Sequence, residues 1–566
     1  MTRVPKHHDT ESRTDAADGE WCSASASVPA ESDRVFLDTV IRHDDGPLLL
    51  YYPRWSHRKL PEYSYVSGRF PHPSSQADHL ATERHPIYIP RSPTDWSDCE
   101  WYRYGIDLYN HGYYWESHEV WESGWHGLGR AGPAADFLKG LIKLAAAGVK
   151  AREGNEAGVR RHARRAAQLF LECRRGRSSG AGCCGGLALD ALEAMAGQWN
   201  AGAATIVARA CQFQSVNLGW RLQPRIPAVQ SQQVRVCSPS RLHFGLSSFA
   251  PADAVAADPE RTWFGGLGVV LETPQYELVV RRTMDAPSTT VTNNARVNCF
   301  LQRWQRTHPT FGVSWVTVDV VQRIPGHAGL GSGTQLGLSL AHALNGLWGV
   351  STCTPHDLAR SVGRGLRSAV GTYGFTAGGL LVDGGKRTGE ELGQLELQAA
   401  VPYEWRFVLV RRTGQRGCHG DAERQAFDHL RGTPPEISDR LRRLIAEQIV
   451  PALATADCAA FGDAVHTYGK LAGECFRPCQ GGPFADASVA QLVATIRRLG
   501  ISGVGQSSWG PTVFAITPDQ ATAQGLVETL RNQAGDDPMD YHIARPRQMG
   551  TSLEPLPDLA ETSGQR

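Results

Sequence analysis

Between residues 98 and 200, apolar side chains recur at the spacing of an amphipathic helix. The stripe is clear over residues 104–125, and residues 138–149 repeat it. The pair Gly154-Asn155 marks a turn before a third helical stretch, residues 156–175. We therefore predict a small all-α bundle over residues 98–200.

After Pro227 the pattern changes, because short runs rich in β-branched and aromatic residues alternate with helical stretches. This alternation predicts one mixed domain over residues 232–546, with both helices and strands, so the fold class is α+β. The predicted strands include residues 234–237, 277–280, 315–321 and 407–410, and the predicted helices include residues 335–347, 435–449 and 487–499.

The remaining segments lack a regular pattern. Residues 1–33 are polar and aperiodic, which predicts a disordered tail, and the Pro- and aromatic-rich sequence up to residue 97 predicts irregular structure. Residues 201–231 are interpreted as a linker, and residues 547–566 as a loose C-terminal tail.

Composition narrows the function classes. The 58 Lys and Arg residues against 57 Asp and Glu give a net charge of +1, which argues against a dedicated nucleic-acid or anionic-membrane binder. The longest stretch without charged residues, 324–356, is interrupted by polar residues and glycines, so we expect no membrane span. The N-terminus lacks the apolar core of a signal peptide, and the 13 cysteines match no zinc or haem spacing. Together these features predict a cytoplasmic protein with small-molecule substrates.

The clearest local motif is a glycine-rich loop, residues 323–335, between a predicted strand and an apolar helix. In this arrangement, free backbone N–H groups and a helix N-terminus hold a phosphate. The loop has neither the Gly-Lys-Ser/Thr ending of a common P-loop nor the spacing of a dinucleotide fingerprint, and a turn without a ligand is the alternative. The predicted phosphate-binding residues are Gly329, Leu330, Gly331, Ser332, Gly333, Thr334 and Gln335.

Residues 325–332, Pro-Gly-His-Ala-Gly-Leu-Gly-Ser, resemble the phosphate loop of the galactokinase, homoserine kinase, mevalonate kinase and phosphomevalonate kinase (GHMP kinase) superfamily. Five ordered blocks resemble one branch of it, the β-ribofuranosylaminobenzene 5′-phosphate synthases. The blocks are SPSRLHFGL (238–246), RTWFGGLGVVLETP (261–274), IPGHAGLGSGTQLGL (324–338), GRGLRSAVGTYGFTAGGLLVDGG (363–385) and GVGQSSWGPTVF (503–514). The resemblance implies a GHMP-kinase-like two-layer domain of helices and strands.

It also implies a reaction. In that branch, p-aminobenzoate and phosphoribosyl pyrophosphate give ribofuranosylaminobenzene phosphate, CO2 and pyrophosphate, a step towards tetrahydromethanopterin. Such a pentosyltransferase needs anion binding and positioning more than a nucleophilic side chain. Mg²⁺ is inferred only from the pyrophosphate substrate, no organic cofactor is expected, and the resemblance implies a homodimer.

Guanidinium, imidazole and hydroxyl groups in these blocks suit the anions of the reaction. Trp509 is placed to stack on the aromatic acceptor, although a tight turn is the alternative for residues 506–510. For each arginine, a structural ion pair is the alternative. The catalytic candidates are Arg241, His243 and Arg367, and the substrate-binding candidates are Arg261, Arg323, Ser368, Ser507, Ser508 and Trp509.

One departure separates this chain from the kinases that use a catalytic Asp. Gly371 stands where that Asp is expected, while Asp383 belongs to a strand-and-turn segment further along. Glu423 is a weaker acid or base candidate. The alternatives to a synthase are an ATP-dependent small-molecule kinase of this superfamily and a non-catalytic binding or scaffold protein.

Residues 101–175 resemble a small bacterial helical family that is known only as a domain of unknown function. His118 and Glu122 lie one turn apart on its stripe, a spacing that suits a divalent metal, but the pattern is not the His-Glu-x2-His of zinc proteases. A buried polar network that braces Trp115, Trp121 and Trp125 is the favoured interpretation, and metal binding the weaker one. The arginines within residues 160–165 are interpreted as a solvated helix face.

Overall fold

The computed structural model of the chain describes residues 40–42, 54–73, 96, 99–175, 183–213, 218, 220–222, 231–250, 261–282, 294–311, 313, 316–350, 354–365, 367–415, 417, 425, 430–535 and 537–556. The tail predicted over residues 1–33, residues 557–566 and Glu423 lie outside the described residues.

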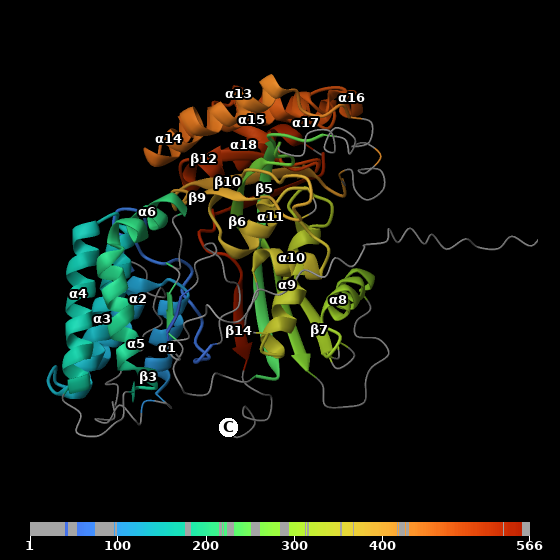
Figure 1. Ribbon diagram of the computed structural model, residues 1–566. Coiled ribbons are helices and arrows are strands. Elements are labelled where there is room, and N and C mark those ends of the chain that lie inside the picture. Colours follow the sequence, from blue (N-terminus) through green and yellow to red (C-terminus); the bar gives the residue numbers. More distant parts are fainter. Residues whose placement is uncertain are drawn as a thin grey trace, which may run out of the picture. The chain divides into compact units, whose positions relative to one another are not determined.

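The predicted bundle is present as six helices in the described part of residues 99–213 (Figure 1). The stripe over residues 104–125 is broken at Gly112, whose positive φ of 80° ends one helix before the next begins. The last helix lies in the segment interpreted as a linker, so that interpretation does not hold for residues 203–213. The helices are α1 (Glu100–Asn110), α2 (Tyr114–Gly127), α3 (Pro133–Arg152), α4 (Glu156–Arg175), α5 (Leu189–Ala201) and α6 (Ala203–Phe213).

Two small antiparallel pairs accompany these helices. One joins β2 (Cys183–Cys184) to β3 (Leu187–Ala188), and the other joins β1 (Val40–Arg42) to β4 (Trp220–Leu222). The second pair uses a further part of the predicted linker. A strand of three residues has too short a pattern to be recognised in sequence and depends on its partner for hydrogen bonds.

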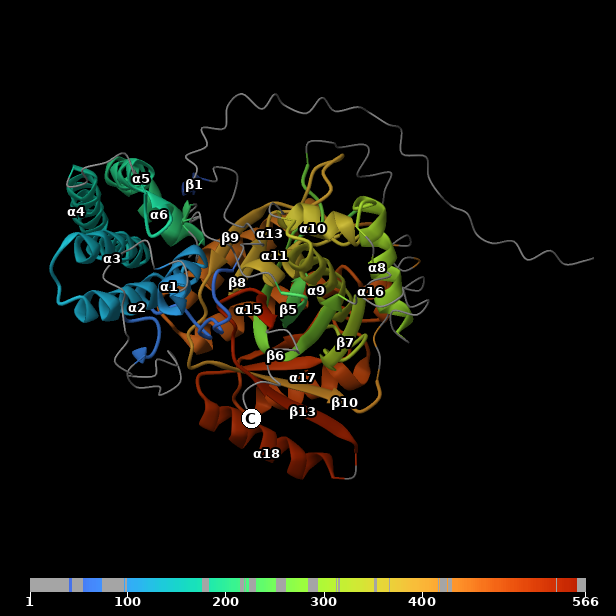
Figure 2. The same ribbon diagram turned by 90° about the horizontal axis from the view of Figure 1, so that it is seen from below.

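The mixed domain contains two antiparallel sheets, which confirms the α+β prediction (Figures 1 and 2). In the larger sheet the order is β14-β5-β6-β8-β9, and the far half of the long strand β6 pairs with β7. Its strands are β5 (Gln233–Leu246), β6 (Gly266–Arg282), β7 (Val316–Gln322), β8 (Leu380–Asp383), β9 (Leu395–Ala399) and β14 (Ser552–Leu556). The smaller sheet has the order β11-β12-β10-β13, formed by β10 (Arg406–Arg412), β11 (Gly503–Gln506), β12 (Val513–Thr517) and β13 (Met539–Ala544).

Strand β14 lies in the segment predicted to be a loose tail. Its residues 552–556 pair with residues 237–233 of β5, so the prediction does not hold for them. The sequence Ser-Leu-Glu-Pro-Leu contains a proline and has little alternation, and it becomes a strand because the outer edge of β5 offers unpaired backbone groups.

Helices cover both sheets. The apolar helix α9 packs on β5 and β6, and α8 packs on α9, around a core that includes Leu242, Leu271, Phe300 and Leu340 (Figure 1). A second core lies where α17 and α18 contact the smaller sheet (Figure 2). The helices of this part are α8 (Ala295–Thr307), α9 (Ser332–Leu347), α10 (Pro355–Ser361), α11 (Val370–Thr376), α13 (Pro435–Leu444) with the π-helical turn η5 (Ile445–Ile449), α14 (Val450–Ala454), α15 (Cys458–Glu474), α16 (Arg477–Gln480), α17 (Ala487–Arg498) and α18 (Gln520–Ala534). Among the described helices, none has both the length and the apolar character that crossing a membrane requires.

Candidate functional site

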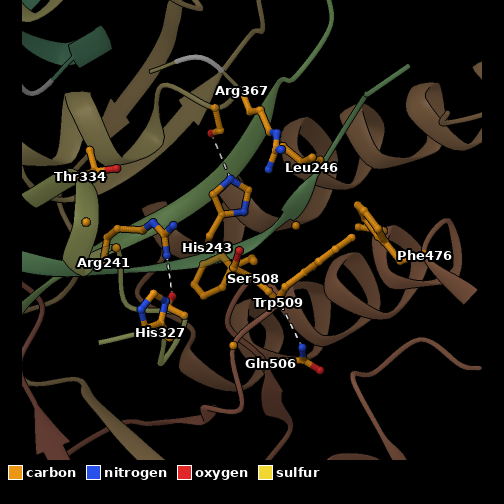
Figure 3. Close-up of a pocket in the computed structure, with 18 of the residues that line it drawn as sticks. Arg241, His243, Leu246, His327, Thr334, Arg367, Phe476, Gln506, Ser508 and Trp509 are labelled. Carbon is orange, nitrogen blue, oxygen red and sulfur yellow. Dashed lines mark hydrogen bonds between the residues drawn. The ribbon is translucent and has the colours of Figure 1, made fainter. Parts of the chain in front are cut away.

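A cavity of about 630 Å³ lies at the N-terminus of α9, where the glycine-rich loop meets the start of the 503–514 block (Figure 3). It is bordered by β5, by residues 363–365, 367 and 368, and by α15. Most of the residues singled out from the sequence meet here, although they come from four distant segments. Those that line the cavity are Arg241, His243, Gly329, Gly331, Ser332, Gly333, Thr334, Arg367, Ser368, Ser508 and Trp509.

The glycine-rich loop leads directly into the first turn of α9, which lines this cavity. Gly331 is the N-cap residue and has a left-handed φ of 79°, which a residue without Cβ adopts most readily. The backbone N–H groups of Ser332, Gly333 and Thr334 have no acceptor within the helix, because they belong to its first turn. The cavity therefore contains the helix N-terminus that the loop motif predicted, and anions are favoured there.

Arg241 holds the loop from one side. Its backbone N–H donates to Leu330 O over 3.2 Å, and its Nη1 donates to Gly329 O over 2.6 Å. The guanidinium also lies over Gly331, where an added Cβ would come within 3.4 Å of Nε. Arg241 thus positions the loop and brings a positive charge beside it.

The 503–514 block holds the loop from the other side. Ser507 Oγ donates to Gly329 O over 2.8 Å, and Thr512 Oγ1 donates to Ala328 O over 2.7 Å. Gly329 and Gly510 approach so closely that a Cβ on either residue would collide with backbone atoms of the other segment. Two sequence blocks separated by more than 150 residues are therefore fitted together at glycines.

A chain of hydrogen bonds runs from the cavity into the sheet through His243, Ser368 and Asp383. His243 Nε2 lies 3.1 Å from Ser368 Oγ, which donates to Asp383 Oδ2 over 3.0 Å (Figure 3 labels His243 and draws its bond as a dashed line). Asp383 also accepts from the backbone N–H groups of Ala369 and Gly385, over 2.6 and 3.0 Å. The sequence placed Asp383 in a strand and turn, and the structure brings its carboxylate to the site through Ser368.

Burial determines the protonation states of Asp383 and His243 in this chain of hydrogen bonds. It raises the pKa of Asp383 to about 6, against the three hydrogen bonds, which lower it. Burial and the positive charge of Arg241 lower the pKa of His243 to about 3, so the imidazole is neutral near pH 7. With Asp383 ionised, the Ser368 hydroxyl donates to the carboxylate and His243 Nε2–H donates to Ser368. The Nδ1 lone pair of His243 is then an acceptor.

The opposite end of the cavity has an aromatic wall. Trp509 and Phe476 meet edge to face, with ring centroids 5.1 Å apart, and Leu246 packs in the same apolar cluster. In Figure 3, Thr334 in the first turn of α9 and Phe476 lie on opposite sides of His243. The cavity thus combines an anion-binding end, a central imidazole and an apolar end that suits a planar ring.

Some predicted residues do not line the cavity. Arg261 lies over the Trp263 ring at 4.4 Å, and Arg323 is exposed beyond the end of β7. Ser507, Leu330 and Gln335 are buried and act on the backbone around the cavity, as when Gln335 Nε2 donates to Gly371 O over 2.9 Å. The cavity gives no support for substrate binding by Arg261 or Arg323, and these roles stay predictions.

Several residues that line the cavity were not singled out from the sequence. Arg364 stands in the quoted 363–385 block, three residues before Arg367, but nothing in the sequence distinguishes the two. Arg296 lies outside every quoted block, just after the Asn294 that caps α8. The other notable ones are His327, Phe476 and Phe484.

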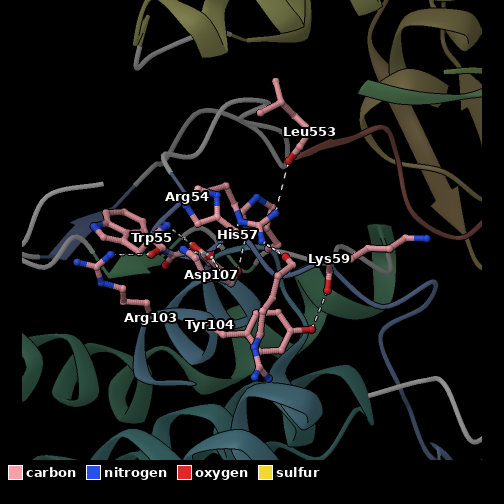
Figure 4. A network of polar contacts seen from close by, with 12 residues as sticks. Arg54, Trp55, His57, Lys59, Arg103, Tyr104, Asp107 and Leu553 are labelled. Carbon is pink, nitrogen blue, oxygen red and sulfur yellow. Dashed lines mark hydrogen bonds and ion pairs between the residues drawn. The ribbon is translucent and has the colours of Figure 1, made fainter. Parts of the chain in front are cut away.

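In the helical unit, the buried polar network rests on Asp107 (Figure 4). The carboxylate of Asp107 pairs with Arg54 Nε at 2.9 Å and accepts from the backbone N–H groups of Trp55 and Ser56. Glu116 is buried as well and accepts from Tyr65 N over 2.7 Å. This network joins Asp107 and Glu116 to residues 54–65 and does not use Glu122, so the predicted network that braces Trp115, Trp121 and Trp125 stays a prediction.

His118 and Glu122 are half-exposed and lie beside Glu119. His118 Nδ1 is 3.3 Å from Glu119 Oε1 and 3.8 Å from Glu122 Oε2, and these three form the group in the described residues whose ligand atoms are close enough to hold a metal ion. Metal binding here stays a prediction. On α4, Arg160 pairs with Glu156 and Arg165 with Glu172, as expected for a solvated helix face.

Comparisons with known proteins find three matching segments in the chain. Residues 296–379 match the family described as GHMP kinases N terminal domain, and residues 450–536 match GHMP kinases C terminal. Residues 102–162 match a domain of unknown function, DUF309.

Two archaeal proteins named β-ribofuranosylphenol 5′-phosphate synthase are among the relatives. The one from Methanothermobacter thermautotrophicus is 29% identical over 208 residues, which are 35% of this chain and 62% of that protein. The one from Archaeoglobus fulgidus is 27% identical over 343 residues, 57% of this chain and 99% of that protein. A 4-diphosphocytidyl-2-C-methyl-D-erythritol kinase from Gloeothece citriformis is 24% identical over 267 residues, 45% of this chain and 75% of that protein.

Among solved structures, a homoserine kinase from Cytophaga hutchinsonii is 14% identical, with a TM-score of 0.40 over 58% of this chain and 99% of that chain. A mevalonate pyrophosphate decarboxylase from Streptococcus pyogenes is 12% identical, with a TM-score of 0.43 over 59% of this chain and all of that chain. The family matches and the archaeal relatives confirm the resemblance seen in the sequence blocks: the chain has homologues among the ribofuranosyl phosphate synthases of the GHMP kinase superfamily, and it carries a DUF309 domain.

Proposed function

We propose that the chain transfers the ribose 5-phosphate unit of phosphoribosyl pyrophosphate to a para-substituted benzoate, with release of CO2 and pyrophosphate. The observation that carries this proposal is the single cavity with an anion-binding helix N-terminus at one end and the Trp509 and Phe476 wall at the other. The archaeal relatives, homologous to this chain, are named as synthases of a ribofuranosyl phosphate joined to an aromatic ring.

The bonds of this reaction balance without a further reactant. A π-electron pair of the ring forms the C–C bond to the anomeric carbon of the ribose, and the C–O bond to pyrophosphate breaks with its pair leaving on oxygen. The bond between the same ring carbon and the carboxylate then breaks, and its pair restores the aromatic ring as CO2 departs. Positive charge develops on the sugar, and negative charge on the leaving group.

Groups around the cavity are suited to stabilise both of these charges. Backbone N–H groups at the first turn of α9 and the nearby arginines stabilise the leaving group. The neutral imidazole of His243 lies between the two ends of the cavity and accepts a hydrogen bond from a ribose hydroxyl through Nδ1. The ionised Asp383 behind Ser368 orients that imidazole and places negative charge near the cationic sugar.

The cavity offers no carboxylate ligand for Mg²⁺, because no Asp or Glu is among the described residues that line it. Mg²⁺ would therefore come bound to the pyrophosphate group of the substrate. Among acceptors we propose p-aminobenzoate. The relatives' name contains a phenol, which makes p-hydroxybenzoate the acceptor to compare.

Release of labelled CO2 tests this function. The full chain with Mg²⁺ and phosphoribosyl pyrophosphate is incubated with carboxyl-labelled p-aminobenzoate or p-hydroxybenzoate. We expect release that depends on phosphoribosyl pyrophosphate and is faster with one acceptor, which identifies the substrate. Folded protein that releases no CO2 from either acid would refute the proposal and leave the kinase and the binding or scaffold alternatives.

A kinase is the second candidate, because one relative is named as a kinase of a diphosphocytidyl-methylerythritol. The lining of the cavity disfavours it, since no Asp or Glu among the described lining residues is placed to take a proton from an acceptor hydroxyl. ATP turnover with candidate alcohols, in the absence of any benzoate, would support the kinase over the synthase.

Replacing Trp509 by leucine is expected to weaken binding of the aromatic acid. Loss of ring stacking against the substrate should raise the KM for the benzoate about tenfold, with the KM for phosphoribosyl pyrophosphate changed less than about twofold. Trp125→Leu, which changes a half-buried tryptophan of α2 outside the cavity, is the matched control. Equal effects on both KM values would mean that Trp509 only shapes the turn.

A further inference from the structure

Two arginines that the sequence did not single out converge on the first turn of α9. An added Cβ at Gly333 would lie 2.9 Å from Arg296 Nη2 and 3.2 Å from Arg364 Nη2. Both side chains line the cavity, and they come from α8 and from the turn after α10. Two guanidinium groups therefore flank the helix N-terminus on the side of Gly333, whereas Arg241 lies over Gly331.

Helix α8 fixes the position of both arginines. Arg296 stands in its first turn, where Asn294 Oδ1 caps the helix by accepting from the backbone N–H groups of Arg296 and Val297. Phe300 follows Arg296 by one turn, and the Arg364 guanidinium lies 4.9 Å from the centre of its ring. The same ring contacts α9, because a Cβ at Gly337 would lie 3.0 Å from it. One face of α8 thus supplies one arginine and the platform for the other.

We infer that Arg296, Arg364 and the backbone N–H groups of residues 332–334 form a diphosphate subsite, which takes the pyrophosphate group of phosphoribosyl pyrophosphate. This inference rests on the proposed function. Of the two anionic groups on that substrate, the diphosphate carries more negative charge and more acceptor oxygens than the phosphate monoester. The diphosphate therefore suits the part of the cavity where two guanidinium groups lie beside the N-terminus of α9.

Gly333 has a defined part in this subsite. Its missing side chain leaves the space between the two guanidinium groups and the helix backbone open, so that phosphate oxygens reach the N–H groups directly. A methyl group at this position would occupy the space in which Arg296 and Arg364 meet a ligand. Because Gly333 has no side chain, the pyrophosphate can approach the backbone N–H donors closely.

The stereochemistry of the product agrees with this assignment. Phosphoribosyl pyrophosphate carries its diphosphate on the α face of the ribose, and the relatives are named for a β-linked product. A direct displacement therefore requires the ring to approach from the side opposite to the leaving group. Thr334, at the diphosphate end, and Phe476, in the aromatic wall, lie on opposite sides of His243 (Figure 3).

The subsite is tested by binding two fragments of the substrate to the full chain, inorganic pyrophosphate and ribose 5-phosphate. Arg296→Gln and Arg364→Gln are each expected to raise the Kd of pyrophosphate about tenfold or more, because each removes a charge-assisted hydrogen-bond donor. The Kd of ribose 5-phosphate should change less than about twofold. Calorimetric titration at fixed ionic strength measures both constants.

Exposed arginines provide matched controls. Arg306→Gln removes the same charge from the last turn of α8, and Arg360→Gln removes it from α10, four residues before Arg364. Neither of these two arginines lines the cavity, and neither variant should change the Kd of pyrophosphate. If the controls lose as much affinity for pyrophosphate as Arg296→Gln and Arg364→Gln do, the effect comes from the overall positive charge of the protein. This result would overturn the inference.

The outcomes separate the subsite from the function. The wild type could release CO2 while Arg296→Gln and Arg364→Gln weaken the binding of both fragments equally, or of neither. This result would overturn the diphosphate assignment and leave the proposed synthase function intact. Wild-type protein that releases no CO2, yet binds pyrophosphate with the expected dependence on both arginines, would support the subsite and refute the synthase. Circular dichroism and thermal unfolding of each variant show that the fold is retained.

Discussion

Alanine at Gly329 is expected to abolish measurable turnover and to lower the free energy of unfolding by about 2–4 kcal/mol, the range of a clash or backbone-strain mutation. Gly329 has a φ of 82°, and an added Cβ would collide with Ser507 O and lie 2.9 Å from Gly510 Cα. The loop would have to move away from the 503–514 block, and the first turn of α9 would move with it. CO2 release and denaturant unfolding measure the two effects.

Gly414→Ala isolates the part of this effect that comes from backbone conformation alone. Gly414 has a comparable φ of 76°, and no atom lies within 4 Å of an added Cβ. This control should lose only about 1–2 kcal/mol and keep its activity. If Gly329→Ala behaves like Gly414→Ala, the close approach of the two glycine segments does not shape the site.

Replacing Asp383 by asparagine is expected to lower kcat about a hundredfold, the size of effect found when one oriented electrostatic group is removed from an active site. An amide has a single acceptor oxygen, so it cannot replace both carboxylate oxygens, which accept from Ser368, Ala369 and Gly385, and the negative charge near the sugar is lost. Initial rates at saturating substrates measure the effect, and KM should change little because Asp383 does not line the cavity.

The pH dependence gives this prediction a second readout. The active chain needs ionised Asp383, whose pKa is about 6, so the kcat of the wild type should rise as the pH increases through about 6. Asp383→Asn should lose this limb of the profile. A kcat profile that keeps the limb in the variant would assign the titration to another group.

Stability should change in the opposite direction over the same pH range. Folding raises the pKa of Asp383 from 3.8 to about 6, so the folded state holds the proton more tightly than the unfolded state does. The contribution of Asp383 to the free energy of unfolding is therefore present in full below about pH 4 and is lost as the pH rises through about 6, a difference of roughly 3 kcal/mol. Unfolding by denaturant at about pH 4.5 and about pH 7 should show roughly two thirds of this difference, about 2 kcal/mol.

Two further variants complete the test of the hydrogen-bond chain. Ser368→Ala keeps the carboxylate but breaks its link to His243, and should reproduce most of the loss in kcat. Glu396→Gln removes an exposed carboxylate of β9 whose charge acts on Asp383, and should leave kcat nearly unchanged. A loss in Glu396→Gln as large as in Asp383→Asn would mean that total charge, and not the chain, is responsible.

Local structure was readable from the sequence wherever consecutive residues encode it. The strand before Arg323, the glycine-rich loop and the helix after it lie where the apolar pattern predicts them. The bundle helices follow their apolar period, with a break at Gly112 that the stripe conceals. Strand β14 was missed, because its five residues acquire their extended conformation from the open edge of β5.

The members of the site were readable only in part. Residues in the glycine-rich loop share a cavity because they are neighbours in the chain. Arg261 and Arg323 stand in or beside matching blocks and yet do not line the cavity, whereas Arg296, which no block contains, does. A positive side chain looks the same in sequence whether it points into a cavity or into solvent.

By itself, then, the sequence determined the α+β class, the helical unit, the phosphate loop and the resemblance to ribofuranosyl phosphate synthases. Only the tertiary structure decided which arginines flank α9, that Asp383 reaches His243 through Ser368, and that Gly329 packs on Gly510. The physical reason is that helix and strand periods arise between residues a few positions apart. The site joins segments that are far apart in the chain, and their meeting is set by how α9 packs on the sheet and α8 packs on α9.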